Sequence, residues 1–318
     1  MKNKGIIIFL IILAVIIVAV MVGDFLSSRP EKSGANPFKY DVDQFKNVDE
    51  ELILYKETKN FKIGFESPAG ISISNNLIYL AGDSKVSVID FSGKLVKEFN
   101  LEGTPNSIKV GNGKIFIAYE TFLTIYDLEG NLLNKIDDFN ENSFLKSIAV
   151  KGTEIFIADA GQRLIYRLSE EGVVLGNFDG KSSDEDFGFI VPSPYFDLAF
   201  NAEGDLWVVN PGMHSFENYT GEGDLRTFWK NTSMETPGFS GCCNPAHFTF
   251  LPDGSFVTSE KGMVRIKIYK PSGEFFGVVA APNKFVAEGH APEVAVDDLG
   301  NVYALDFDKK LLRVFELK

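Results

Sequence analysis

Three histidines, His214, His247 and His290, are the side chains in this sequence best suited to bind a metal ion. Neutral imidazoles are preferred ligands of zinc and other divalent metals, so a convergent set of three would leave a fourth position for water. Asp159 and Glu260 are carboxylates that could serve as a further ligand or as a general base. The alternative is that each histidine only hydrogen-bonds to loop backbone. Zinc is therefore the cofactor that these residues suggest.

Two adjacent cysteines form the most unusual local feature, in the stretch Gly241 to Pro245. If the Cys242–Cys243 pair is oxidised, its eight-membered ring makes a stiff turn that presents Asn244 and His247. A second interpretation is a dithiol/disulfide switch, because a strained disulfide is easier to reduce. A third is a Cys/His site for a soft metal such as copper, which requires reduced thiols.

The elements that position these residues come from a pattern repeated six times. Each repeat predicts two paired strands, a polar gap, a third strand, a tight turn and a fourth strand, with apolar residues alternating along the first strand. Spacings of 37, 40, 51, 50 and 46 residues separate the equivalent second-strand positions Ile78, Ile115, Ile155, Leu206, Phe256 and Val302. Repeats of about 40–50 residues with four strands each are typical of propeller blades.

The sixth repeat ends at the C-terminal Lys318, one strand short. We expect Leu52 to Ile63 to supply that strand, which closes the ring and leaves no unpaired edge. The fold class predicted for 51–318 is therefore an all-β, six-bladed β-propeller, and the alternative is another antiparallel β fold. The paired strands, the Asp-Gly and Asn-Gly turns and the aromatic third strands resemble NHL-type six-bladed propellers, in particular a membrane-anchored bacterial-type member.

That resemblance implies a ring with its functional loops on one face. Within the NHL group, peptidyl-hydroxyglycine amidating lyases bind zinc through histidines in such a ring. The present chain is similar in having its three histidines on one face, but they come from adjacent repeats, so the lyase activity is not carried over. The longest loops, 178–193, 231–244 and 280–292, lie on the same face over repeats 4 to 6.

Positive charges also gather on that face. Lys85, Arg163 and Arg265 begin equivalent third strands, and Lys261 lies in a neighbouring loop. They would suit a small anionic ligand, unless each pairs with a nearby carboxylate. The candidate ligand-binding residues are Asp159, Arg163, Asn210, His214, Cys242, Cys243, Asn244, His247, Glu260, Lys261, Arg265 and His290.

An apolar stretch at 5–23 precedes the repeats and is nearly long enough to span a hydrocarbon core of about 30 Å. Lys2 and Lys4 before it predict a cytoplasmic stub at 1–4, a single-pass anchor at 5–23, a tether at 24–50 and an extracytoplasmic ring, periplasmic or on the cell surface. A cleaved signal peptide is the alternative.

Composition narrows the function. A net charge of −13 over 318 residues argues against nucleic-acid binding, and two cysteines cannot make a disulfide-rich scaffold or a four-cysteine zinc site. No P-loop, dinucleotide fingerprint, HExxH or GxSxG sequence is present. The sequence therefore favours a membrane-tethered module that binds a small anionic ligand or a protein of a membrane complex. A His-dependent metalloenzyme or a redox-active enzyme on the same face is the alternative.

Overall fold

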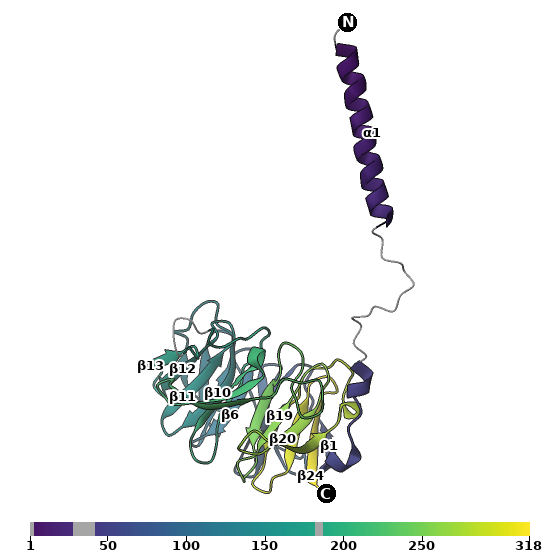
Figure 1. The fold of residues 1–318 in the computed structure, drawn as a ribbon. Helices are drawn as coiled ribbons and strands as arrows, with labels where there is room; N and C mark the ends of the chain where they lie inside the picture. The colour runs from purple at the N-terminus through teal and green to yellow at the C-terminus, as the bar shows by residue number, and fades with distance from the viewer. Residues whose placement is uncertain (1–2, 28–41, 182–186) are drawn as a thin grey trace. The chain divides into compact units, whose positions relative to one another are not determined.

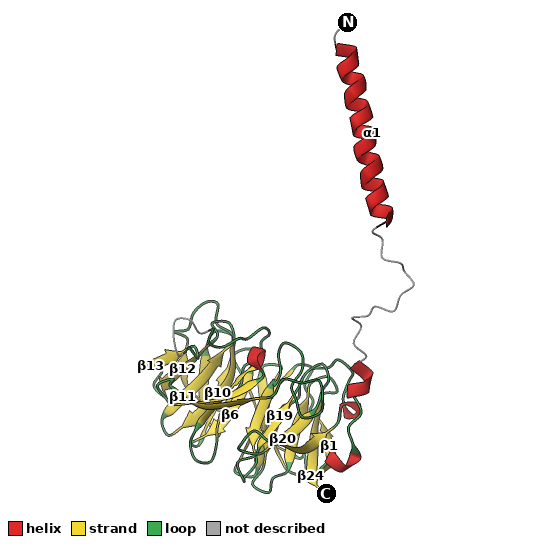
Figure 2. Ribbon diagram, viewed as in Figure 1, coloured by secondary structure: helices red, strands yellow, loops and turns green. Residues whose placement is uncertain are grey.

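The computed structural model describes residues 3–27, 42–181 and 187–318, which belong to two compact units, Met1–Val42 and Asp43–Lys318. The first unit contains the helix α1 (Asn3–Ser27), drawn in red in Figure 2. Its segment Lys4–Phe25 has a mean hydropathy of 3.5 and is long and apolar enough to cross a membrane. The predicted anchor at 5–23 lies within this helix, whereas 28–41 of the predicted tether lie outside the described residues.

The second unit is a propeller of six antiparallel sheets with four strands each (Figure 1). Blade 1 consists of β2 (Pro68–Ser74), β3 (Leu77–Gly82), β4 (Lys85–Asp90) and β5 (Leu95–Asn100). Blade 2 consists of β6 (Ser107–Gly111), β7 (Lys114–Ala118), β8 (Leu123–Asp127) and β9 (Leu132–Ile136). Blade 3 consists of β10 (Leu145–Lys151), β11 (Glu154–Asp159), β12 (Leu164–Ser169) and β13 (Val174–Phe178).

The remaining blades follow the same order along the chain. Blade 4 consists of β14 (Leu198–Phe200), β15 (Leu206–Asn210), β16 (Ser215–Tyr219) and β17 (Leu225–Lys230). Blade 5 consists of β18 (His247–Phe250), β19 (Phe256–Ser259), β20 (Ile266–Tyr269) and β21 (Phe275–Ala280). Blade 6 consists of β22 (Glu293–Val296), β23 (Val302–Asp306), β24 (Leu311–Leu317) and β1 (Tyr55–Lys62). Short 3-10 turns are η1 (Val42–Phe45), η2 (Glu50–Leu52), η3 (Pro211–Met213) and η4 (Pro282–Lys284).

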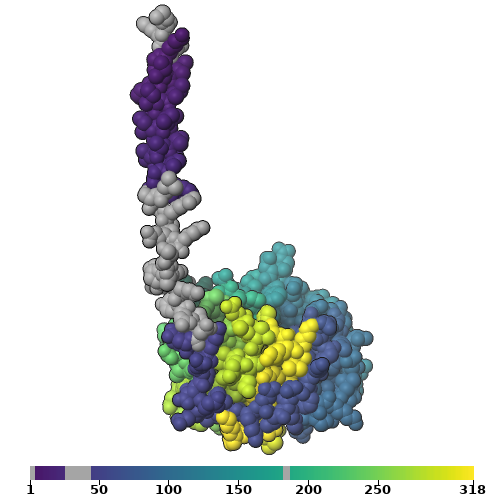
Figure 3. All heavy atoms as spheres, turned by 90° about the vertical axis from the view of Figure 1, so that its right-hand side faces the viewer, coloured from purple at the N-terminus to yellow at the C-terminus, as the bar shows by residue number. Residues whose placement is uncertain are grey.

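The ring is closed by its two ends, as the sequence predicts. The N-terminal strand β1 pairs antiparallel with the C-terminal strand β24, from Tyr55 opposite Leu317 to Lys62 opposite Leu311. In Figure 3 the dark-blue surface of the N-terminal part of the propeller and the yellow surface of the C-terminal strand lie side by side. Pairing of β1 with β24 leaves the last blade with a full set of strands and joins both chain ends of the ring.

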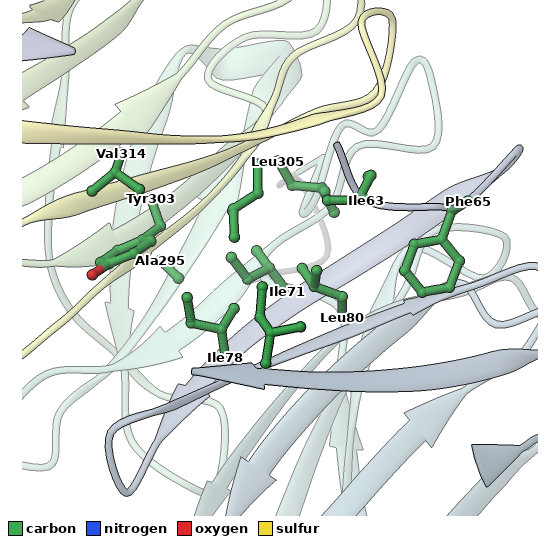
Figure 4. Packing of buried hydrophobic residues seen from close by; sticks show 11 residues of the cluster. Ile63, Phe65, Ile71, Ile78, Leu80, Ala295, Tyr303, Leu305 and Val314 are labelled. Carbon is green, nitrogen blue, oxygen red and sulfur yellow. The ribbon is translucent and has the colours of Figure 1, made fainter. Parts of the chain in front are cut away.

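Apolar side chains fill the spaces between neighbouring blades. The described residues form six buried clusters, one at each blade-to-blade boundary. Figure 4 shows the cluster where blade 6 meets blade 1, in which Ile71 and Ile78 lie opposite Leu305 and Val314. The alternating pattern of each strand places one apolar row against each neighbour, and full burial of such a side chain contributes about 1.5–3 kcal/mol.

Glycines in the turns between third and fourth strands let one blade pack under the next. Gly223 has a φ of +96°, and a Cβ there would lie 2.4 Å from Phe178 of the preceding blade. Gly273 has a φ of +84°, and its Cβ would lie 2.5 Å from the ring of Trp229. Only glycine satisfies both the left-handed backbone and the close contact, which accounts for the recurring turn in the sequence.

The first strand of each blade lies nearest the ring axis. These strands contact one another in sequence, from β2 and β6 around to β22 and back to β2. Together they line a narrow axial channel that contains a cavity of about 110 Å³. The channel leads to the face that carries the second-to-third and fourth-to-first connections, and the candidate site lies there.

Candidate functional site

A cavity of about 900 Å³ lies at that end of the channel and is called the mouth cavity below. Its lining comes from all six blades and includes Ser67, Asn106, Lys146, Tyr195, Lys261 and His290. Most of these residues lie in connections that enter a first strand or join a second strand to a third. A cavity of this size matches the volumes of known small-molecule sites.

Four charged side chains connect the mouth cavity with the axial channel. Glu293 lines both spaces, Lys146 lines the mouth cavity, and Lys109 and Asp197 line the channel. They lie on, or directly before, the first strands of four different blades. The ring axis therefore carries two amino groups and two carboxyl groups, although the whole chain has a net charge of −13.

The two lysines, called the channel lysines below, are not neutralised by direct contacts. Among the described residues, neither Lys109 nor Lys146 has an ammonium group in a hydrogen bond or ion pair, and Lys146 only lies 5.3 Å from the ring centre of Phe144. Burial lowers the pKa of both lysines, and the charges of Asp197 and Glu293 oppose this shift. Each ammonium group thus has three donors available to an incoming acceptor.

The two carboxyl groups differ in their surroundings. Asp197 accepts hydrogen bonds from the Ser147 hydroxyl and from the backbone N–H groups of Leu198 and Phe248, which link blades 3, 4 and 5. Burial raises the pKa of Glu293 well above its ordinary value, and the charge of Asp197 raises it further. The charges of Lys146 and Lys109 act against this rise.

The three histidines do not come together as one ligand set. His247 and His290 line the mouth cavity. The His247 Nδ1 lies 3.7 Å from an Asp197 oxygen, and the His290 Nδ1 lies 2.7 Å from Asp308. His214 is absent from that lining and contacts the Thr232 hydroxyl at 3.0 Å and the Gly241 carbonyl.

No group of three or more His, Cys, Asp or Glu side chains is arranged to hold a metal ion in the part of the chain that the structure describes. Asp159, the predicted base or further ligand, is fully buried in blade 3 and accepts hydrogen bonds from the backbone N–H groups of Phe144, Gly161 and Gln162. The donor set therefore fits a structural role at these positions better than zinc.

The cysteines lie at the wall of the mouth cavity, beside Ser193 and Lys261 of its lining. Both are free thiols, Cys242 is exposed and Cys243 is buried, and their sulfur atoms lie 2.9 Å apart. Asn244 fixes their loop, because its side chain accepts from the Lys261 N–H at 2.9 Å and donates to two backbone carbonyls. The Lys261 ammonium donates to the Ser193 hydroxyl at 3.3 Å.

Beneath this loop is a fully buried ion cluster. Glu260 accepts from Arg265 at 3.1 and 2.9 Å and faces Lys267 at 2.8 Å. The two cations also donate to carbonyls of the 231–244 loop, Arg265 to Gly238 and Lys267 to both Gly238 and Thr236. Glu260 and Arg265 therefore hold the loop from below and do not face the mouth cavity.

The other predicted residues lie elsewhere. Arg163 is exposed in blade 3 and adopts a φ of +57°. Asn210 is buried in blade 4, where it accepts from the Ile190 N–H and donates to Glu217. Lys85 is paired with Glu98 at 3.0 Å. Of the twelve predicted site residues, the mouth cavity and its wall bring together His247, His290, Lys261, Cys242, Cys243 and Asn244.

The channel lysines, Asp197 and Glu293 were not predicted from the sequence. A signal was present for Lys109, which occupies the middle position of a first strand where the other five blades have Ser72, Ala149, Ala199, Thr249 and Ala295. A lysine at a position otherwise held by small residues marks a side chain that points to the ring axis. Lys146 and Glu293 lie at the beginnings of first strands, where the sequence shows no comparable difference between one blade and the others.

Comparison with known proteins agrees on the fold. No family model and no curated protein matches the chain. It is similar to a virginiamycin B lyase from Staphylococcus aureus, with 14% identity over 83% of this chain and 100% of that chain and a TM-score of 0.59. A protein of unknown function from Bacteroides thetaiotaomicron gives 13% identity, 83% and 76% coverage and a TM-score of 0.61.

A third similar structure is the WD40 propeller domain of Doa1, with 14% identity, 79% coverage of both chains and a TM-score of 0.57. At these identities the likeness concerns the propeller architecture alone. The propeller fold is thus shared with a lyase and with a WD40 domain.

Proposed function

We propose that this protein is a membrane-tethered, extracytoplasmic binding module of the NHL-type propeller group, and that it binds a small anionic ligand in the mouth cavity. The observation that carries the proposal is the placement of the channel lysines. Their ammonium groups, which have no hydrogen-bond partner among the described residues, face the axis of a ring below a cavity of about 900 Å³. Burying such charges is costly unless an anion completes the site.

Several features support an anion rather than a cation as the ligand. Asp197 already accepts three hydrogen bonds from protein groups, so little of its acceptor capacity is left for a cation. Lys261 and His247 at the wall of the mouth cavity add further donors to the rim. The proposed binding face includes blades 4 to 6, where the sequence predicts it, and extends to the loops of the other three blades.

We infer the membrane tether from the apolar helix α1. An uncleaved anchor would hold the propeller at the membrane, and the lysines at positions 2 and 4 favour a cytoplasmic N-terminus. The propeller would then lie outside the cytoplasm. A small-ligand site in this position suits a protein that supplies or senses a solute for a membrane complex.

The test is thermal unfolding of the full-length chain in detergent, with inorganic phosphate, sulfate and citrate as probes. At a free-probe concentration of about 100 times Kd, binding stabilises the folded state by about 2.7 kcal/mol. We expect at least one probe to stabilise the wild type, and the Lys109→Met/Lys146→Met double variant to lose that stabilisation. Lys270→Met, which removes an exposed lysine paired with Glu274, is the matched control and keeps it. The proposal is wrong if no probe stabilises the wild type, or if the double variant responds as the control does.

A further inference from the structure

The adjacent cysteines are not used by the proposed binding site, although much of blade 5 serves to position them. The ion cluster of Glu260, Arg265 and Lys267 fixes the 231–244 loop from below, and Asn244 ties the loop to Lys261. The loop thus holds one buried and one exposed sulfur side by side at the wall of the mouth cavity.

The two sulfurs have different chemical environments. Burial acts to raise the pKa of the Cys243 thiol, but hydrogen bonds with Cys242 and Ser193 and the Lys261 ammonium outweigh it and leave that pKa below its ordinary value. The hydrogen bond with the Cys243 sulfur raises the pKa of Cys242. Cys243 is therefore the sulfur better able to carry negative charge, and Cys242 is the sulfur that a partner can reach.

We propose that Cys242 and Cys243 form a redox couple that exchanges with a dithiol-bearing partner at the wall of the mouth cavity. The couple carries two electrons, with a disulfide as its oxidised form and the two free thiols seen here as its reduced form. Because Cys242 is exposed and Cys243 is better able to carry negative charge, a partner thiolate attacks Cys242 and Cys243 is the leaving group.

In the forward direction a partner thiolate attacks the exposed Cys242 sulfur of the oxidised pair. A bond forms between the partner sulfur and Cys242, the bond between Cys242 and Cys243 breaks, and its electron pair stays on Cys243. The Lys261 ammonium and the Ser193 hydroxyl stabilise this thiolate. The partner's second thiolate then attacks its own sulfur in the mixed disulfide, which releases Cys242 as a thiolate that takes a proton from water. The partner dithiol is oxidised to a disulfide and the cysteine pair is reduced; a partner disulfide reverses both steps.

The test uses the full-length chain in detergent, equilibrated with a series of ratios of reduced to oxidised glutathione. Thiols are then trapped with a maleimide and counted by mass. We expect both thiols to be lost together in a monomer whose mass is lower by two hydrogens. The result that overturns the proposal is a chain that keeps both thiols under oxidised glutathione, or one in which oxidation only links two molecules.

Single variants test the assigned roles. In Cys243→Ser the exposed Cys242 should form a stable mixed disulfide with glutathione, whereas in Cys242→Ser the buried sulfur should do so at least about tenfold more slowly. Lys261→Met removes the charge that stabilises the reduced form, so it should shift the equilibrium about tenfold towards the disulfide, while Lys270→Met leaves it unchanged. Equal rates for the two cysteine variants, or equal equilibria for the two lysine variants, would contradict the roles.

The location of this couple outside the cytoplasm rests on the topology given under the proposed function. The exchange chemistry between the cysteines and a partner does not depend on that location. Loss of the couple with anion binding intact would refute only this inference. Loss of anion binding with the couple intact would refute only the proposed function.

Discussion

Neutralising Glu260 should destabilise the propeller more than neutralising any exposed carboxylate, because two buried cations depend on it. Glu260→Gln keeps the side-chain shape but removes the charge that faces Arg265 at 3.1 and 2.9 Å and Lys267 at 2.8 Å. All three side chains are fully buried. Breaking a buried ion pair by removing one partner costs about 3–5 kcal/mol, since the remaining charge has no compensation.

Lys267 is the second group that the loss of the Glu260 charge affects. Burial lowers the pKa of Lys267 to about 7, and Glu260 is the main group that opposes this shift. Without the Glu260 charge that pKa falls further, so the Lys267 ammonium is lost at neutral pH. Its hydrogen bonds to the loop carbonyls of Gly238 and Thr236 then weaken as well.

The assay is thermal unfolding of the full-length chain followed by circular dichroism. At about 2 °C per kcal/mol for a domain of this size, Glu260→Gln should lower Tm by roughly 6–10 °C. The matched control is Glu274→Gln, which breaks a pair with Lys270 whose side chains are 64% and 43% exposed and should cost less than about 1 kcal/mol. Similar shifts in Tm for the two variants would refute the assignment of the buried cluster as the support of the loop.

Two further predictions concern the axis and the anchor. Burial raises the pKa of Glu293 in the folded state, and the charged groups around it are Asp197, Lys146 and Lys109. The contribution of Glu293 to the stability of the fold is therefore lost as the pH rises above the pKa that this side chain has in the unfolded chain. Glu293→Gln should therefore gain in Tm relative to the wild type as the pH rises above the ordinary pKa of a glutamate, and a difference in Tm that stays constant with pH would contradict this. An alkaline phosphatase fused after Lys318 should be active in cells, and inactivity would contradict an extracytoplasmic propeller.

The fold could be predicted because each repeat contains the same local sequence pattern of strands and turns. Alternation along first strands such as Ile71 to Ile73, together with turns such as that of Gly273, gives strand positions that do not depend on distant contacts. Closure by β1 followed from counting strands in the last repeat, and the β1–β24 register confirms it.

The site could be predicted only in part. Which side chains come together at the ring axis depends on the orientation of each strand and loop in the folded ring. His214 was predicted to join the other two histidines, but its ring faces Thr232 and Gly241 in place of the mouth cavity. The sequence does not place Lys109 beside the other charged residues of the channel, because these come from other blades. Arg265 was predicted as a rim cation, yet it is fully buried against Glu260.

The most direct measurement for the proposed function is the position of a bound anion at the ring axis. Selenate carries a heavy atom and has the charge and shape of sulfate, so anomalous diffraction from crystals of the full-length chain soaked in it reports that position. We expect the strongest selenate site to lie in contact with the ammonium groups of Lys109 and Lys146, and Lys146→Met to weaken it. Ordered selenate on the outer surface with none beside the channel lysines would contradict the proposed function.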